Sequence, residues 1–201
     1  MCQVIAVTGM MGRGKSTMIE HLQGMLVDCT ALFEDDFNMA PLKSLPEIQA
    51  WWNRGGHVEE FDLSPLVQQL QQHAAQSPAE SSAGSPLVLL ETQFGRLHPQ
   101  LGPWIDFQCW IEVPSDIAFA RKVGQLSRQF LNEPQPADSG NPLQWIAGFC
   151  DGYLNTTRQL FERQRQQLSQ EADVVVDGQG DPFDVCDRVW QALPVSFKTA
   201  A

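Results

Sequence analysis

The sequence predicts an α/β protein, a three-layer sandwich in which helices cover both faces of a mostly parallel five-stranded sheet. Short apolar runs alternate with longer segments whose apolar residues recur at helical spacing. This alternation is typical of a parallel sheet, because parallel neighbours need a crossover between them. The 201 residues suffice for one domain, so we expect residues 1–201 to fold as one unit. The predicted strands are residues 4–7, 30–33, 87–90, 107–113 and 173–176.

The segments between these runs predict the helices and loops. Residues 77–86 and 132–142 are rich in turn-forming residue types, and we expect a turn and a loop there. Residues 143–168 predict one long helix with a kink near Gly152. The other predicted helices are residues 17–26, 46–54, 64–76, 116–131 and 182–193.

Composition narrows the class of partner. Acidic residues outnumber basic ones 24 to 13, and no basic block occurs, so neither nucleic acid nor an anionic membrane is an expected partner. No apolar run approaches the ~18 residues of a membrane span, and the N-terminus does not have the pattern of a signal peptide. The five cysteines show neither metal-site spacing nor a disulfide framework. These features favour a cytoplasmic protein that acts on a small molecule, and they leave a homo-oligomer open.

A phosphate-binding loop lies directly after the first predicted strand. Its eight residues match the pattern G-x-x-x-x-G-K-[ST] at every fixed position, and a predicted helix follows, as the motif requires. We therefore predict the fold of P-loop nucleoside triphosphate hydrolases. The residues expected to bind the nucleotide are Gly9, Met10, Met11, Gly12, Arg13, Gly14, Lys15, Ser16 and Thr17.

Each residue type in this loop has a physical role. Glycines let the backbone turn so that its N–H groups point at phosphate oxygens. The N-terminus of the following helix adds a partial positive charge. Lys15 would reach the β- and γ-phosphates, and the Ser16 hydroxyl would ligate Mg²⁺. The expected cofactors are ATP and Mg²⁺.

The loop alone does not determine the activity. A GTPase would need an Asn-Lys-x-Asp segment, and a transporter-type ATPase would need a Leu-Ser-Gly-Gly-Gln signature, and the sequence contains neither. A small-molecule kinase needs a carboxylate near the acceptor hydroxyl, another near Mg²⁺, and cations over the transferring phosphoryl group. A non-catalytic nucleotide sensor and a nucleotide monophosphate kinase are the alternatives.

Acidic residues follow two predicted strands. Asp35 and Asp36 come just after the second strand, and Glu91 ends the third apolar run. Ligands of open parallel sheets bind at the carboxyl ends of the strands, so these carboxylates are candidate site residues. The alternatives are a solvated turn, with Asp36 as a helix cap, and a surface position for Glu91.

Four segments in order resemble the phosphoribulokinase/uridine kinase family, including its nicotinamide riboside kinase relatives. They are "GMMGRGKST", "FEDDFN", "VLLETQFG" and "WIDFQCWIEVPSDIAFARKV". "EADVVVDG" at residues 171–178 also resembles the late strand of this family. The resemblance spans almost the whole chain and implies a uridine kinase-like phosphotransferase with an alcohol group as acceptor.

The resemblance also implies roles for single residues. Asp35 matches the residue that accepts the proton of the acceptor hydroxyl, and Glu91 matches the one that organises Mg²⁺ and its waters. Arg121 matches the first arginine of a small lid, here expected around residues 121–142. With Lys15, Asp35 and Arg121 form the expected catalytic set. The family's next Arg-Asp pair is missing, which leaves open whether Lys122 and Arg128 replace it.

The region between the second and third strands forms the acceptor pocket in this family. We accordingly expect Asp36, Trp52 and His57 to contact the acceptor. Arg96 is expected to contact it as well, because it lies in the loop just after Glu91, and the loop after a strand tip faces the site. A tryptophan can stack on a ring or sugar face. Neither the acceptor nor a preference between ATP and GTP follows from the sequence.

Overall fold

The computed structural model of the protein describes residues 2–26, 29–37, 45–75, 86–132 and 141–198. Within these segments, five strands form a single parallel sheet in the order β2-β3-β1-β4-β5. The predicted five-stranded parallel sheet is therefore confirmed. The strands are β1 (Gln3–Thr8), β2 (Cys29–Phe33), β3 (Leu87–Thr92), β4 (Phe107–Glu112) and β5 (Val174–Asp177).

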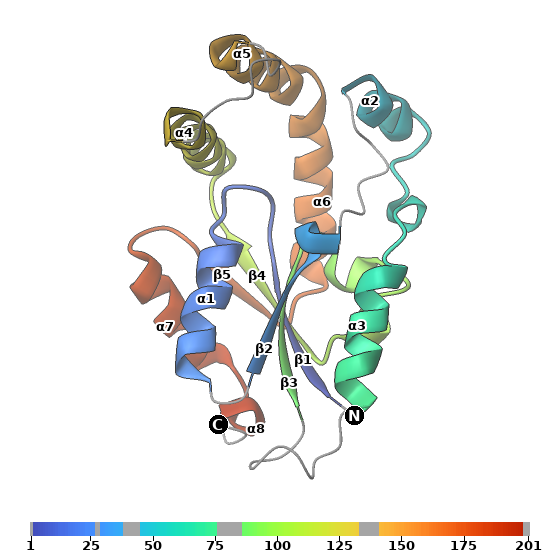
Figure 1. Ribbon diagram of the computed structural model, residues 1–201, viewed down its shortest axis with the longest axis vertical. Helices are drawn as coiled ribbons and strands as arrows, with labels where there is room; N and C mark the ends of the chain where they lie inside the picture. Colours follow the sequence, from blue (N-terminus) through green and yellow to red (C-terminus); the bar gives the residue numbers. More distant parts are fainter. Residues whose placement is uncertain (1, 27–28, 38–44, 76–85, 133–140, 199–201) are drawn as a thin grey trace.

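Helices cover both faces of the sheet, which confirms the three-layer sandwich (Figure 1). Alternate residues of β1 face opposite layers. Ile5 and Val7 pack with α1 (Lys15–Met25) and α7 (Pro182–Ala192), whereas Val4 and Ala6 pack with α3 (Ser64–Ala75). The covering helices are α1 (Lys15–Met25), α3 (Ser64–Ala75), α6 (Arg158–Gln170), α7 (Pro182–Ala192) and the short α8 (Val195–Lys198).

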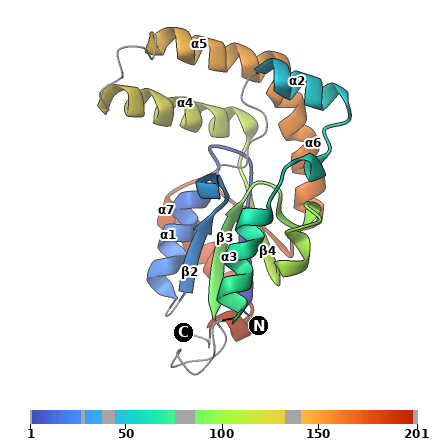
Figure 2. The same ribbon diagram turned by 45° about the vertical axis from the view of Figure 1, so that its right-hand side comes forward.

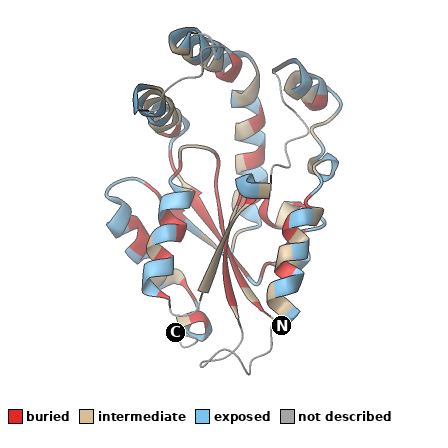
Figure 3. Cartoon of the chain, viewed as in Figure 1, coloured by how far each residue is buried: buried red, intermediate tan, exposed pale blue. Residues whose placement is uncertain are grey.

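Three helices lie beyond the carboxyl ends of the strands rather than on the sheet. They are α2 (Leu45–Asn53), α4 (Ser115–Asn132) and α5 (Pro142–Gly152). In both views, α4 and α5 lie side by side and extend away from the sheet (Figure 2). Their residues are mostly exposed or half-buried, whereas the buried residues concentrate in the sheet and on the helix faces turned toward it (Figure 3).

The predicted long helix over residues 143–168 divides at its expected kink. A π-helical turn, Tyr153–Thr157, follows Gly152 and joins α5 to α6, which run in different directions (Figure 2). The other predicted helices and strands agree with the structure to within two residues at each end. The predicted loops at 77–86 and 132–142 lie almost entirely outside the described residues.

No helix in the described segments is both long enough and apolar enough to cross a bilayer.

Candidate active site

The loop between β1 and α1 has the backbone geometry of an anion cradle. Gly12 and Gly14 have φ angles of 74° and 87°, a backbone region that residues with a side chain rarely adopt. Gly14 caps the N-terminus of α1, and no side chain caps this helix end. The first N–H groups of α1 therefore remain available to an anion such as a phosphate.

The side chains of Lys15 and Glu91 meet beside this cradle. Lys15 Nζ lies 3.3 Å from Glu91 Oε1, and each side chain is only 12% exposed. Glu91 pairs in register with Val7 of β1, which places it at the strand end that leads into the loop. Ser16 and Thr17 are exposed in the first turn of α1. This cradle suits Mg²⁺-bound triphosphate, with Ser16 and Glu91 as candidate holders of the ion and its waters.

Within the described residues, no group of three or more acidic, histidine or cysteine side chains forms a self-sufficient metal site. Mg²⁺ in phosphoryl-transfer sites typically uses one or two protein oxygens together with phosphates and waters, so the Ser16 and Glu91 pair fits this mode.

Asp35 and Asp36 lie at the end of β2, in the 3-10 turn Glu34–Phe37, and both are exposed. The turn starts with Glu34, which was not among the residues predicted for the site. Glu34 is 5% exposed, and its Oε2 accepts hydrogen bonds from Thr92 Oγ1 and from Gln93 N, the latter at 3.3 Å. The available signal was the run of three acidic residues that begins directly after β2.

Burial raises the pKa of Glu34 to about 7, although the hydrogen bonds from Thr92 and Gln93 and the charge of Lys15 act in the opposite direction. The Thr92 hydroxyl also accepts hydrogen bonds from Phe94 N at 3.1 Å and Gly95 N at 3.2 Å. Glu34 and Thr92 thus hold together the ends of β2 and β3, next to Asp35.

A pocket of about 340 Å³ opens beside the start of α1. Arg121 of α4 lines it together with Gly14 and Thr17, and Arg121 Nη1 donates a hydrogen bond to Gly178 O at 3.1 Å. The pocket thus adjoins the loop on the side of β5 and α7. The remaining lining residues are Arg13, Met18, Gly178, Gly180, Pro182 and Val185.

A second pocket, of about 200 Å³, lies between α2, the end of β3 and α6. We call it the aromatic pocket, because four aromatic side chains line it: Trp51, Phe61, Phe94 and Phe161. Its other lining residues are apolar or uncharged polar: Ile48, Gln93, Thr157, Leu160 and Gln164. Gln93 connects it to the Glu34 network, since Gln93 N donates to Glu34.

The predicted acceptor residues do not gather in this pocket. Trp52 lies outside its lining, with the Arg163 guanidinium 5.4 Å from its ring centroid. His57 is exposed, and its Nδ1 lies 3.8 Å from Glu59 Oε1. The neighbouring Trp51 is buried and lines the pocket instead.

Arg96 points away from the carboxyl ends of the strands. Its Nη2 lies 2.7 Å from Asp173 Oδ2 and donates to Asp106 O at 3.0 Å. Asp106 and Asp173 directly precede β4 and β5, so Arg96 stabilises the amino ends of these two strands. The structure therefore does not bring Arg96 together with the other candidate residues.

The two residues considered as lid substitutes lie on α4. Lys122 Nζ donates to Gln125 Oε1 at 3.3 Å, and Arg128 is exposed. Among the described residues, no hydrogen bond or ion pair links either side chain to the phosphate-binding loop. Arg13 of the loop is 3% exposed, and its Nη1 donates a hydrogen bond to Ile111 O of β4 at 3.3 Å.

Comparisons with known proteins relate this chain to kinases. No family model matches it. It is 29% identical to a shikimate kinase of Nostoc sp., over 96% of this chain and 92% of the relative. It is 21% identical to a uridine kinase of Borreliella burgdorferi, over 88% of this chain and 86% of the relative.

Solved structures of shikimate kinases from Aquifex aeolicus and Bacteroides thetaiotaomicron also align with the chain. Each has a TM-score of 0.48, with 15% and 12% identity respectively. The alignments cover 94% of this chain and 95% or 96% of the other chain. The fold assignment rests on the sheet order and on the loop between β1 and α1.

Both relatives are kinases, and the loop between β1 and α1 of this chain has the P-loop pattern, so the prediction of an ATP-binding P-loop kinase is confirmed at this level. The comparisons do not favour a uridine kinase over a shikimate kinase, because the similarity to shikimate kinase covers at least as much of the chain.

Proposed function

We propose that the protein is an ATP-dependent kinase that phosphorylates a hydroxyl group of an uncharged, ring-bearing small molecule such as a nucleoside. The observation that carries the proposal is the Lys15–Glu91 ion pair beside the start of α1, which no side chain caps. A lysine paired with a carboxylate at this place can exchange that partner for the oxygens of a bound triphosphate. Glu91 is then free to bind the waters of Mg²⁺.

Different residues would bind the phosphates and activate the acceptor. Bound ATP supplies the transferable phosphoryl group, and Mg²⁺ offsets its charge. The loop N–H groups and Lys15 hold the phosphates. Asp35, exposed at the end of β2, orients the acceptor hydroxyl and accepts its proton. A non-catalytic sensor would need no such base.

The aromatic pocket supports an uncharged acceptor. Its described lining contains no charged side chain. The nearby arginines are engaged elsewhere: Arg54 pairs with Glu60 at 2.9 Å, and Arg163 stacks on Trp52. An acceptor phosphate, as in a nucleotide monophosphate kinase, would need such cations. Aromatic rings suit the faces of a base or a sugar.

A hydroxy acid is the second candidate acceptor, because the chain is 29% identical to a shikimate kinase. A carboxylate in the aromatic pocket would have to attract a cation that its described lining does not provide.

The proposal is tested by coupled ADP release over three matched groups of acceptors: nucleosides and neutral sugars, hydroxy acids, and nucleoside monophosphates. We expect turnover with the first group. Turnover confined to hydroxy acids would replace the uncharged acceptor with the second candidate. Mg-ATP binding without turnover of any acceptor would favour the sensor.

Asp35→Asn tests the proposed base, because it keeps the shape of the side chain and removes its proton-accepting charge. We expect single-turnover transfer to fall by about 10²–10⁴-fold. Mg-ATP affinity should stay equal or rise slightly, since a negative charge near the triphosphate is lost. Asp36→Asn is the matched control and should raise the KM of the acceptor more than it slows transfer. Transfer at the wild-type rate in Asp35→Asn would remove Asp35 from the mechanism.

A further inference from the structure

Arg13 belongs to the phosphate-binding loop, yet its guanidinium is buried against β4. Arg13 Nη1 lies 3.3 Å from Glu112 Oε1 and donates to Ile111 O at 3.3 Å. The guanidinium carbon lies 5.1 Å from the centroid of the Trp110 ring. A cation that is 97% buried needs a compensating charge, and Glu112 supplies it.

The Glu112 carboxylate collects three donors from different parts of the chain. Besides Arg13, Trp110 Nε1 donates to Glu112 Oε2 at 2.7 Å, and Arg165 Nε donates to Oε1 at 2.8 Å. Burial opposes the charge on Glu112, but the hydrogen bonds from Trp110 and Arg165 and the charges of Arg13 and Arg165 outweigh it and lower its pKa. The carboxylate is therefore ionised at neutral pH and is held in one orientation.

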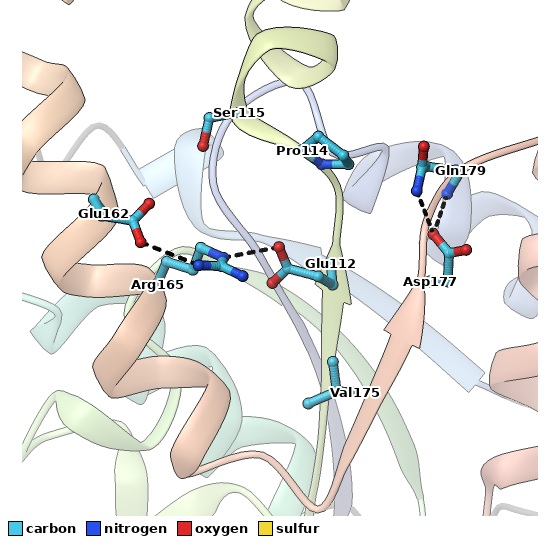
Figure 4. Close-up of a pocket in the computed structure, with 8 residues that line it drawn as sticks. All are labelled: Glu112, Pro114, Ser115, Glu162, Arg165, Val175, Asp177 and Gln179. Atoms are coloured by element: carbon cyan, nitrogen blue, oxygen red, sulfur yellow. Dashed lines mark hydrogen bonds and ion pairs between the residues drawn. The ribbon is translucent and has the colours of Figure 1, made fainter.

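Arg165 connects this carboxylate to α6. Its Nη1 also donates to Glu162 Oε1 at 3.1 Å (Figure 4). Glu112, Glu162 and Arg165 line an open pocket of about 640 Å³ on the α6 side of β4 and β5. Solvent reaches Arg165 and Glu162, whose side chains are 39% and 47% exposed, but hardly reaches Arg13.

The position of Arg13 in the loop makes its anchoring consequential. It lies between Gly12 and Gly14, two residues with left-handed backbones, and directly before the cap of α1. Glycines leave the backbone free to move, so the loop needs an anchor to hold its N–H groups in place before a ligand binds. Arg13 Nε has no hydrogen-bond partner among the described atoms, so the Nη1 contacts with Glu112 and Ile111 carry the anchor.

We propose that Glu112 is a positioning residue for the phosphate-binding loop: by holding the Arg13 side chain inside the sheet, it keeps the loop in the shape that binds triphosphate. Arg165 steadies the same carboxylate from α6. This inference rests on the proposed function, since it concerns how the loop is prepared for Mg-ATP.

A positioning role and a purely electrostatic role of Glu112 predict opposite changes in Mg-ATP affinity when Glu112 is replaced. Removing a negative charge near the site should by itself strengthen the binding of an anion. Losing the anchor should weaken it, because the loop N–H groups are no longer pre-ordered.

The experiment measures the Kd of Mg-ATP by calorimetry, at a temperature where circular dichroism shows each variant to be folded. Glu112→Gln keeps the size of the side chain and an acceptor for Trp110, but it removes the charge that compensates Arg13. We expect Kd to rise about tenfold or more. Glu162→Gln is the matched control, since it removes a carboxylate from Arg165 without touching Arg13, and its Kd should stay within about twofold.

Two further variants separate positioning from a purely structural role. Glu112→Asp keeps the charge and should recover part of the lost affinity. Arg13→Met removes the buried charge itself, so it avoids an unpaired cation if Glu112→Gln fails to fold, and it should also weaken Mg-ATP binding. A lower melting temperature with an unchanged Kd in Glu112→Gln, or in Arg13→Met when the former does not fold, would overturn the inference and leave the proposed function intact. A wild-type protein that binds no Mg-ATP would overturn both.

Discussion

At the residue scale, Glu34 is the most unusual group of the candidate site. Its carboxyl group is buried between the ends of β2 and β3, where Thr92 and Gln93 donate to it and Lys15 is the cation that acts on it. The folded protein raises the pKa of Glu34 from 4.5 to about 7. Between these values the folded state holds a proton that the unfolded state has released.

This proton makes stability depend on pH with a definite sign. As pH rises from about 4.5 to about 7, the contribution of Glu34 to the free energy of unfolding should fall by about 1.4 kcal/mol per pH unit. Urea unfolding of wild type and Glu34→Gln over this range isolates the contribution, because the other titrating groups are common to both. Relative to the variant, the wild type should lose stability toward pH 7. A difference that does not vary with pH would contradict the prediction.

For Arg121, kinetics can separate a role in nucleotide binding from a role in the transfer step. Its guanidinium is hydrogen-bonded to Gly178 O and lines the pocket beside Gly14 and Thr17, where part of a bound nucleotide would lie. We therefore expect Arg121→Ala to raise the KM for ATP more than it lowers kcat. Steady-state kinetics with varied ATP measures both. A fall of about 10²-fold in kcat at unchanged KM would instead support the lid role that the family resemblance implies.

At the scale of elements, the phosphate-binding loop packs directly against the start of α4. A Cβ atom built on Gly12 would lie 2.0 Å from Ala118 O, which is backbone and cannot easily give way. A Cβ built on Gly14 would meet nothing within 4 Å, although both glycines have left-handed backbones. Gly12 and Gly14 can therefore be compared directly, because only Gly12 lies in close contact with α4.

Gly12→Ala should therefore destabilise the protein more than Gly14→Ala. The left-handed backbone costs about 1–2 kcal/mol in either variant. The clash with α4 adds roughly 1–3 kcal/mol in Gly12→Ala alone. Denaturant unfolding without nucleotide measures both, so that loss of phosphate binding does not enter the comparison. Equal losses would show that α4 moves away from the loop at no cost.

At the scale of the whole molecule, α4 and α5 form a projecting hairpin with few buried residues (Figure 3). Aromatic rings link it to the π-helical turn: Phe119 stacks on Tyr153 with ring centroids 4.0 Å apart, and Phe149 stacks on Phe119 at 5.8 Å. The lid that the resemblance predicts around residues 121–142 overlaps this hairpin and stays a prediction, with residues 133–140 outside the described residues.

A lid that closes over nucleotide should become ordered when Mg-ATP binds. We expect Mg-ATP to slow amide hydrogen exchange in α4 and α5, while α3, which is packed on the far face of the sheet from α1, keeps its exchange rates. Hydrogen exchange with mass spectrometry measures each helix separately. Unchanged exchange in α4 and α5 at saturating Mg-ATP would contradict the lid.

The sequence by itself determined the five strands, their alternation with helices, the phosphate-binding loop, and the placement of Asp35 and Glu91 at strand ends. These features follow from local patterns, because apolar periodicity and glycine spacing report on burial and backbone freedom within a few residues. Only the tertiary structure decided that Glu34 is buried, that Arg13 turns inward to Glu112, and that Arg96 reaches Asp173 at the opposite sheet edge. Each of these contacts joins residues far apart in the chain, so it depends on how strands and helices pack, which no local pattern encodes. The same reason explains why Trp51, rather than Trp52, lines the aromatic pocket with residues of α6.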